Sequence, residues 1–157
     1  MAQNDLTVAR RDLLIGGSAA VSLLALFGSQ ALAQEKQGAA ALDEAMKAIL
    51  GEAKPVDGKL AFDLPEIAES GNTVPYTVGV ESPMTEADYV RGIYLYAEQN
   101  PLPRIAGFEL GPHNGRAVVS TRIRLATTQQ VLAVALMNDD SAWSATYEVE
   151  VTVSGCG

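Results

Sequence analysis

The sequence contains a single cysteine, Cys156, within the segment Ser154-Gly155-Cys156-Gly157. An exposed thiolate is a nucleophile that can carry a covalent adduct, whereas a buried structural thiol is inert. The flanking glycines remove side-chain bulk and free the backbone. Three residues beyond a strand that ends near Val153 reach about 10 Å. The segment therefore predicts an exposed thiol on a flexible arm that can enter the cleft of another protein.

A lone thiol also has less reactive roles. One cysteine cannot form an intramolecular disulfide, so the thiol either reacts with a cargo or pairs with another chain. No basic residue adjoins Cys156 in the sequence, so nothing there lowers its pKa toward that of a preactivated nucleophile. We therefore expect activation of this sulfur to come from the active site of a partner.

His113 is the only histidine and the one candidate base for a Cys156–His113 pair. It lies in a turn, residues 111–115, without an evident third group to orient it, so a solvated turn residue is expected. A blue-copper centre needs two histidines, and no haem-attachment or zinc-ligand spacing occurs, so no metal is expected. Arg122 and Arg124 are interpreted as a solvated strand face, with a small basic strip as the alternative.

The first 33 residues have the pattern of an export signal. Arg10 and Arg11 precede an apolar run over residues 13–27, and a small-x-small cleavage site follows at Ala31-Leu32-Ala33. The run is shorter than the roughly 20 residues that span a membrane. The paired arginines indicate the twin-arginine route, with an ordinary Sec signal as the alternative. We predict cleavage after Ala33, a single mature domain over residues 34–157 and a periplasmic location.

The predicted mature chain is acidic, with nine Lys and Arg against seventeen Asp and Glu and a net charge of −8. Nucleic-acid binding needs a basic footprint, so this class of function is excluded. The negative surface also repels small anions. An anionic substrate would have to be captured locally or covalently.

Hydrophobic periodicity predicts one short helix followed by strands. The helical stripe consists of Leu42, Ala45, Met46 and Ile49. Gly51 and Pro55 end the helix. Strands are predicted at residues 60–64, 73–81, 90–97, 104–110, 117–126, 129–137 and 146–153. Their number and spacing predict a mainly β fold, an immunoglobulin-like antiparallel β-sandwich of about seven strands.

Two strands carry more specific expectations. Residues 129–137 are apolar on both parities, which is typical of a central strand covered on both faces. In the last strand, Tyr147, Val149, Val151 and Val153 are expected to face inward. Pro75 places its strand at a sheet edge or lies near the start of that strand.

The leader, the strands and the Gly-Cys-Gly segment together resemble the SoxY family, the sulfur-carrier subunits of the periplasmic thiosulfate-oxidising Sox system. The resemblance covers the mature chain, through residues 67–75, 100–103, 105–110, 121–125 and 129–137. The family's tail reads Gly-Gly-Cys-Gly-Gly, so Ser154 replaces its first glycine and its last glycine is missing. The resemblance implies that Cys156 is the site of sulfur attachment and that Ser154, Gly155 and Gly157 form its arm.

The resemblance also implies partners. A SoxZ-like β-sandwich subunit would form a heterodimer with the chain. A cytochrome would join thiosulfate to Cys156, a hydrolase would release sulfate, and a sulfur dehydrogenase would act on the remaining sulfane sulfur. The carrier itself would be no enzyme, and it would need no cofactor besides its covalent adduct. An exposed apolar face with Tyr94, Tyr96, Leu132 and Val134 is expected to bind the SoxZ-like subunit.

Two other functions stay open from the residues alone. The chain would be an exported β-sandwich binding or assembly module if Cys156 formed an intermolecular disulfide. It would be a small thiol enzyme if His113 activated Cys156.

Overall fold

The computed structural model describes residues 38–153. The described chain begins with a helix over residues 38–50. The elements that follow are β1 (Val56–Asp57), β2 (Leu60–Asp63), β3 (Ile67–Ala68), β4 (Val74–Val80), β5 (Val90–Ala97), β6 (Arg104–Glu109), η2 (Pro112–Asn114), β7 (Ala117–Ile123), β8 (Gln129–Met137) and β9 (Ala142–Val151).

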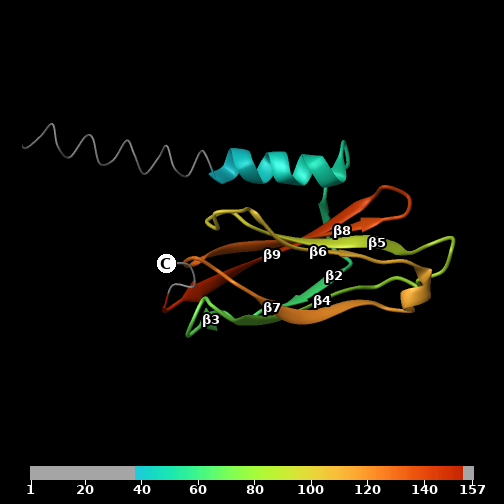
Figure 1. Ribbon diagram of the computed structural model, residues 1–157. Helices are drawn as coiled ribbons and strands as arrows, with labels where there is room; N and C mark the ends of the chain where they lie inside the picture. Colours follow the sequence, from blue (N-terminus) through green and yellow to red (C-terminus); the bar gives the residue numbers. More distant parts are fainter. Residues whose placement is uncertain (1–37, 154–157) are drawn as a thin grey trace, which may run out of the picture. The chain divides into compact units, whose positions relative to one another are not determined.

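The strands form two sheets that pack face to face (Figure 1). The larger sheet has the order β1-β9-β8-β5-β6, and β3 also pairs with β9; the smaller sheet has the order β2-β4-β7. All pairs are antiparallel except those of β1 and β3, which run parallel to β9. The predicted immunoglobulin-like β-sandwich is confirmed, and β1 and β3 are short strands that periodicity did not reveal.

The core lies between the two sheets and follows from strict alternation along the strands. In β4, Val74 and Val78 are fully buried, whereas Pro75 points outward. In β5, Ile93 and Leu95 point into the same core. Each strand contributes every second side chain to this layer because successive side chains alternate between the two faces of a sheet.

The outer face of the larger sheet is covered by the helix. Its stripe, which includes Met46 and Ile49, packs on Tyr96 and Val134, and both of these are fully buried. The helix ends at Gly51, whose φ of 62° favours glycine and whose N–H donates to the carbonyl of Lys47 at 2.9 Å. The predicted helix and the two-sided burial of β8 are confirmed.

The helix corrects one expectation about a partner surface. Tyr94, Tyr96, Leu132 and Val134 were expected on an exposed apolar face, but they pack against the helix instead. The sequence showed one apolar face on the helix and another on the strands. The two faces pack against each other because this contact removes the apolar surface of both from water.

One further detail of the strands differs from expectation, and one agrees with it. Tyr147 in β9 and Val153, two residues after β9, share the inward parity but are 44% and 58% exposed; the ring of Tyr147 packs edge-on against that of Phe62 in β2. Pro75 lies near the start of its strand, as one of the two predicted alternatives had it: it is the second residue of β4, which is the middle strand of its sheet. It is tolerated there because β2 pairs only with Thr77–Val80, so no β2 carbonyl requires its missing N–H.

Candidate functional site

Every predicted site residue lies outside the described residues. These are the attachment site Cys156, the arm residues Ser154, Gly155 and Gly157, and the signal residues Arg10, Arg11, Ala31 and Ala33. The structure therefore informs the site through the segment that leads to it, residues 150–153, and through the surface around that segment.

The end of β9 is held by a backbone ladder against residues 66–71. The N–H of Glu150 donates to the carbonyl of Glu66 at 2.8 Å, and that of Thr152 donates to the carbonyl of Ala68 at 3.0 Å. The N–H of Gly71 then donates to the carbonyl of Val153 at 2.8 Å. The backbone is thus fixed up to Val153, three residues before Cys156.

A second set of bonds joins this ladder to the core. The carbonyl of Gly71 accepts a 2.8 Å hydrogen bond from the N–H of Leu125, whose side chain is fully buried. The hydroxyl of Thr128 accepts a 2.9 Å bond from the N–H of Val151. We call residues 150–153, with their partners in residues 66–71, the tail base. Its position is set by the sandwich.

The side of the tail base along β9 is acidic. A surface pocket of about 610 Å³ is lined there by Glu66, Thr128, Thr146, Tyr147, Glu148 and Glu150. Three carboxylates therefore face this side, and they repel an anion that approaches along it.

A second region near the tail base, next to Leu125, is basic. A surface pocket of about 420 Å³ is lined by Arg104 at the start of β6, Arg122 near the end of β7 and Arg124 directly after β7. Leu102 is 75% exposed at the same pocket. We call Arg104, Arg122 and Arg124 the arginine cluster. The sequence suggested a basic strip only for Arg122 and Arg124, and Arg104 was missed because β6 and β7 belong to different sheets.

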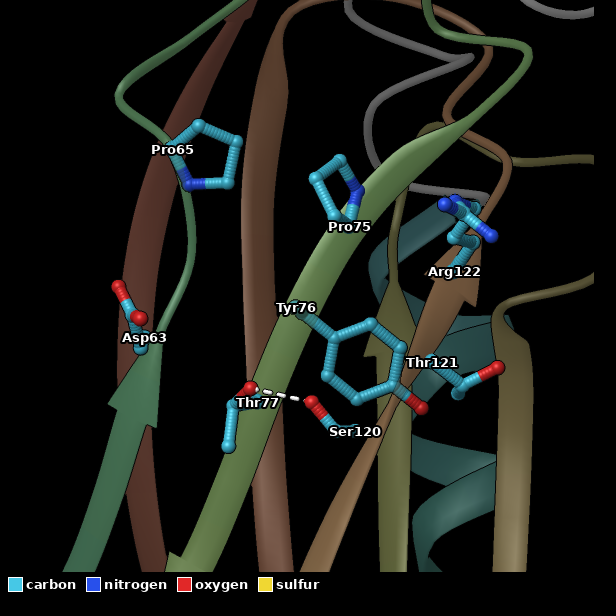
Figure 2. A pocket seen from close by; sticks show the side chains of 8 residues that line it. All are labelled: Asp63, Pro65, Pro75, Tyr76, Thr77, Ser120, Thr121 and Arg122. Atoms are coloured by element: carbon cyan, nitrogen blue, oxygen red, sulfur yellow. Dashed lines mark hydrogen bonds between the residues drawn. The ribbon is translucent and has the colours of Figure 1, made fainter.

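Arg122 also borders a neighbouring pocket on the outer face of the smaller sheet. Figure 2 shows Asp63 and Arg122 on opposite sides of this pocket, with Thr77 and Ser120 between them. The hydroxyls of Thr77 and Ser120 lie 2.6 Å apart and share a hydrogen bond. The residues that line this pocket include no histidine, and Asp63 is their only carboxylate. A base and a group that orients it are therefore not both present, so neither hydroxyl is an activated nucleophile.

Tyr76 lies under the same pocket with its ring in the core. It is 3% exposed, and burial raises its pKa to about 12. Its hydroxyl has no hydrogen-bond partner among residues 38–153. The high pKa keeps this group protonated at neutral pH, so Tyr76 cannot act there as a base.

His113 lies far from the tail base. It is an exposed residue of η2, at the start of β7, and its ring packs over Gly111. The tail base adjoins the other end of β7, and the seven residues of this strand span about 20 Å. Figure 1 shows η2 and the end of β9 at opposite ends of the sandwich. A residue three positions after Val153 reaches only about 10 Å, which argues against a Cys156–His113 pair.

No group of three or more His, Cys, Asp or Glu side chains in residues 38–153 is placed to hold a metal ion. The helix in this part of the chain lacks the length and hydropathy needed to cross a bilayer.

Comparison with known proteins identifies the family of the chain. A family model described as sulfur oxidation protein SoxY matches residues 46–156, a range that includes Cys156. The chain belongs to the SoxY family. Among solved structures, the sulfur carrier protein SoxY from Chlorobium limicola f. thiosulfatophilum is 30% identical, with a TM-score of 0.62. The match covers 73% of this chain and 99% of the Chlorobium SoxY.

More distant structures share the fold alone. A superoxide reductase (neelaredoxin) from Ignicoccus hospitalis is 21% identical over 59% of this chain and 79% of its own, with a TM-score of 0.54. A putative superoxide reductase from Thermotoga maritima is 19% identical over 66% of this chain and 96% of its own, also with a TM-score of 0.54. The comparison with curated proteins gave no significant match.

Proposed function

We propose that this SoxY-family chain is a sulfur carrier that holds thiosulfate-derived intermediates covalently on Cys156 and presents them to partner Sox enzymes. The observation that carries the proposal is the family match, which extends to residue 156 and so includes the only thiol of the chain. The backbone ladder at Val153 supports it, because a fixed base with a short segment beyond it limits where the sulfur can travel.

The chemistry needs an external oxidant and an external hydrolase. In the loading step, the Cys156 thiol and thiosulfate form Cys–S–S–SO₃⁻, and one proton and two electrons are released to a cytochrome partner. In the next step, water cleaves the terminal S–S bond, which gives Cys–S–SH and hydrogen sulfate. The chain supplies only the attachment atom in both steps, so we propose that it is a carrier subunit and no enzyme.

We further propose a periplasmic heterodimer with a SoxZ-like subunit. The outer face of the smaller sheet supports this proposal, because no described element covers it, whereas the helix covers the larger sheet. Small side chains such as Ala61 and Gly79 lie on this face beside Tyr147. A sheet face that no other element of the chain covers can pack against a second sheet.

Intact-protein mass spectrometry tests the carrier function. The purified heterodimer would be incubated with thiosulfate and the cytochrome partner, and the mass of the chain would be followed over time. We expect the wild type to gain one thiosulfate-derived group on Cys156 and Cys156→Ser to gain none while its melting temperature stays unchanged. His113→Ala serves as the control and should load like the wild type.

Two results would contradict the carrier function. One is an unmodified Cys156 while thiosulfate is being consumed. The other is a stable disulfide-linked dimer on a non-reducing gel that remains the active form, which would favour the assembly module.

A further inference from the structure

The arginine cluster stands out against the charge of the rest of the protein. Residues 38–153 contain eight Lys and Arg side chains against sixteen Asp and Glu side chains. Three of the eight line the single pocket between the start of β6 and the end of β7. The one ion pair found within residues 38–153 joins Arg91 to Asp140, so no carboxylate of this part of the chain neutralises the cluster by direct contact.

The backbones that carry the cluster are fixed by one side chain. Asn100 donates a 2.8 Å hydrogen bond from Nδ2 to the carbonyl of Arg124, and its Oδ1 accepts a 2.9 Å bond from the N–H of Ala126. The turn before β6 and the segment after β7 are thus joined at the pocket. Arg104 and Arg124 therefore line one pocket although β6 and β7 belong to different sheets.

The cluster lies within reach of Cys156. Val153, Gly71 and Leu125 are successive rungs of the tail-base ladder, so Val153 and Leu125 are separated by two strand spacings, about 10 Å. Leu125 directly follows Arg124. Three residues beyond Val153 reach about 10 Å. This length matches the separation of Val153 from Leu125, so a group on Cys156 can reach the side of the sandwich that carries Arg122 and Arg124.

The charges around the tail base favour one direction for an anion. The acidic pocket with Glu66, Glu148 and Glu150 lies along β9, and the arginine cluster lies on the side of β6 and β7. Exposed charges act over a Debye length of about 8–10 Å, which matches the dimensions of this region. A negatively charged group at Cys156 is therefore repelled from β9 and attracted toward β7.

We propose that Arg104, Arg122 and Arg124 form a docking pocket for the oxyanion end of the cargo on Cys156, the terminal sulfonate of a thiosulfonate adduct. The identity of the cargo depends on the proposed carrier function. The positive electrostatic potential near Cys156 does not depend on that function. Guanidinium groups suit this ligand because their forked N–H donors bind oxyanions in bidentate geometry. The pocket holds the cargo against the carrier between partners and releases it when a stronger site competes.

Charge-selective alkylation tests the potential without any Sox partner. The rates at which Cys156 reacts with anionic iodoacetate and neutral iodoacetamide would be compared in the full chain at low salt. Their ratio should fall about two- to fivefold in R122Q/R124Q and by a smaller factor in R104Q. The difference in this ratio between the wild type and the variants should vanish at high salt. R116Q, at the other end of β7, is the matched control and should keep the wild-type ratio.

A second experiment tests the cargo directly. Tetrathionate loads a cysteine chemically, since the thiolate displaces thiosulfate and keeps the other half as Cys–S–S–SO₃⁻. The side-chain Nε–Hε signals of Arg104, Arg122 and Arg124 should shift on loading in heteronuclear NMR spectra, while the Arg116 signal stays unchanged. Cys156→Ser, which cannot be loaded, should show no shift.

The two experiments separate this proposal from the carrier function. An unchanged alkylation ratio in R122Q/R124Q, or an equal fall in R116Q, would overturn the docking pocket. So would unmoved cluster signals in the loaded protein, even if partner enzymes load Cys156 normally. Shifted signals together with a failure of enzymatic loading would uphold the pocket and count against the carrier function alone.

Discussion

Gln129 donates a 2.9 Å hydrogen bond from its side-chain amide to Oδ1 of Asn100, across 29 positions of the sequence. The same amide donates to the carbonyl of Thr127 at 3.2 Å, and its oxygen accepts a 2.8 Å bond from the N–H of Gln99. Gln129 is only 6% exposed. This polar side chain therefore joins the turn before β6 to the start of β8, beside the arginine cluster.

Replacement of Gln129 by methionine should destabilise the fold. Met has a similar length but removes three hydrogen bonds and leaves the N–H of Gln99 without its partner. We expect a loss of about 2–4 kcal/mol in the free energy of unfolding, measured by urea denaturation. Gln130→Met, at an exposed neighbouring position, should change it by less than about 0.5 kcal/mol. Equal effects at both positions would show that the network contributes nothing.

Phenylalanine at two buried tyrosines should stabilise the protein. The hydroxyls of Tyr76 and Tyr96 have no hydrogen-bond partner in residues 38–153. A buried hydroxyl without a partner costs about 1–3 kcal/mol, so Tyr76→Phe and Tyr96→Phe should each raise the free energy of unfolding by about 1 kcal/mol. Tyr147→Phe, at a 44% exposed position, is the control and should have little effect. A loss of stability in either buried variant would reveal a partner for its hydroxyl.

The same tyrosines predict a loss of stability at alkaline pH. Burial raises the pKa of Tyr76 to about 12, and it also raises that of Tyr96 to about 12, with Arg104 lowering it and Tyr94 raising it further. The unfolded chain releases these protons near pH 10.0. The contribution of these raised pKa values to the free energy of unfolding is therefore fully present below pH 10 and is lost as the pH rises toward 12.

Denaturation curves at several pH values between 8 and 12 would measure this effect. The wild type should lose stability more steeply than Tyr76→Phe/Tyr96→Phe over the upper half of this range. Parallel curves for the two proteins would contradict the assignment, because lysine and arginine titration is common to both.

The helix should be essential to the larger sheet. Leu50 is 8% exposed and packs with Tyr96 and Val134, so Leu50→Ala should cost about 2–4 kcal/mol. Lys47→Ala, on the exposed face of the same helix, should have an effect below about 0.5 kcal/mol. A mild effect at Leu50 would mean that a partner subunit, and not the helix, covers this face of the sheet.

Export can be tested through the paired arginines of the leader. If the twin-arginine route is used, Arg10→Lys/Arg11→Lys should leave the chain uncleaved in the cytoplasm. The wild type should appear in the periplasm with Gln34 as its first residue. These outcomes would be read from cell fractions by intact mass. Normal export of the double variant would indicate the Sec route.

Much of the fold could be predicted because burial leaves a periodic signal. The stripe with Met46 and Ile49 predicted the helix, and the apolar run of β8 predicted two-sided cover. The sequence could not show that these two features cover each other, because periodicity marks a buried face but does not name what buries it. The same limit explains why the face of Tyr96 was expected to meet a partner.

The sequence predicted the type of site, a covalent attachment site, but not the residues that lie around it. The glycine-flanked Cys156 indicated an attachment site from local sequence alone. The ladder from Val153 through Gly71 to Leu125 depends on two-residue pairing, which is too short to leave a pattern. The cluster of Arg104 with Arg122 and Arg124 depends on how two sheets stack, and spacing along the chain does not encode that arrangement.

The pairing of β9 at its two ends has a consequence for self-association. β1 holds Trp143 and Ser144, and β3 holds Glu150 and Val151. Between them, residues 145–149 present an edge that is open within the described chain. A foreign strand could occupy no more than about 17 Å there and would meet the charge of Glu148. Copies of this protein therefore cannot extend into a continuous intermolecular sheet along this side.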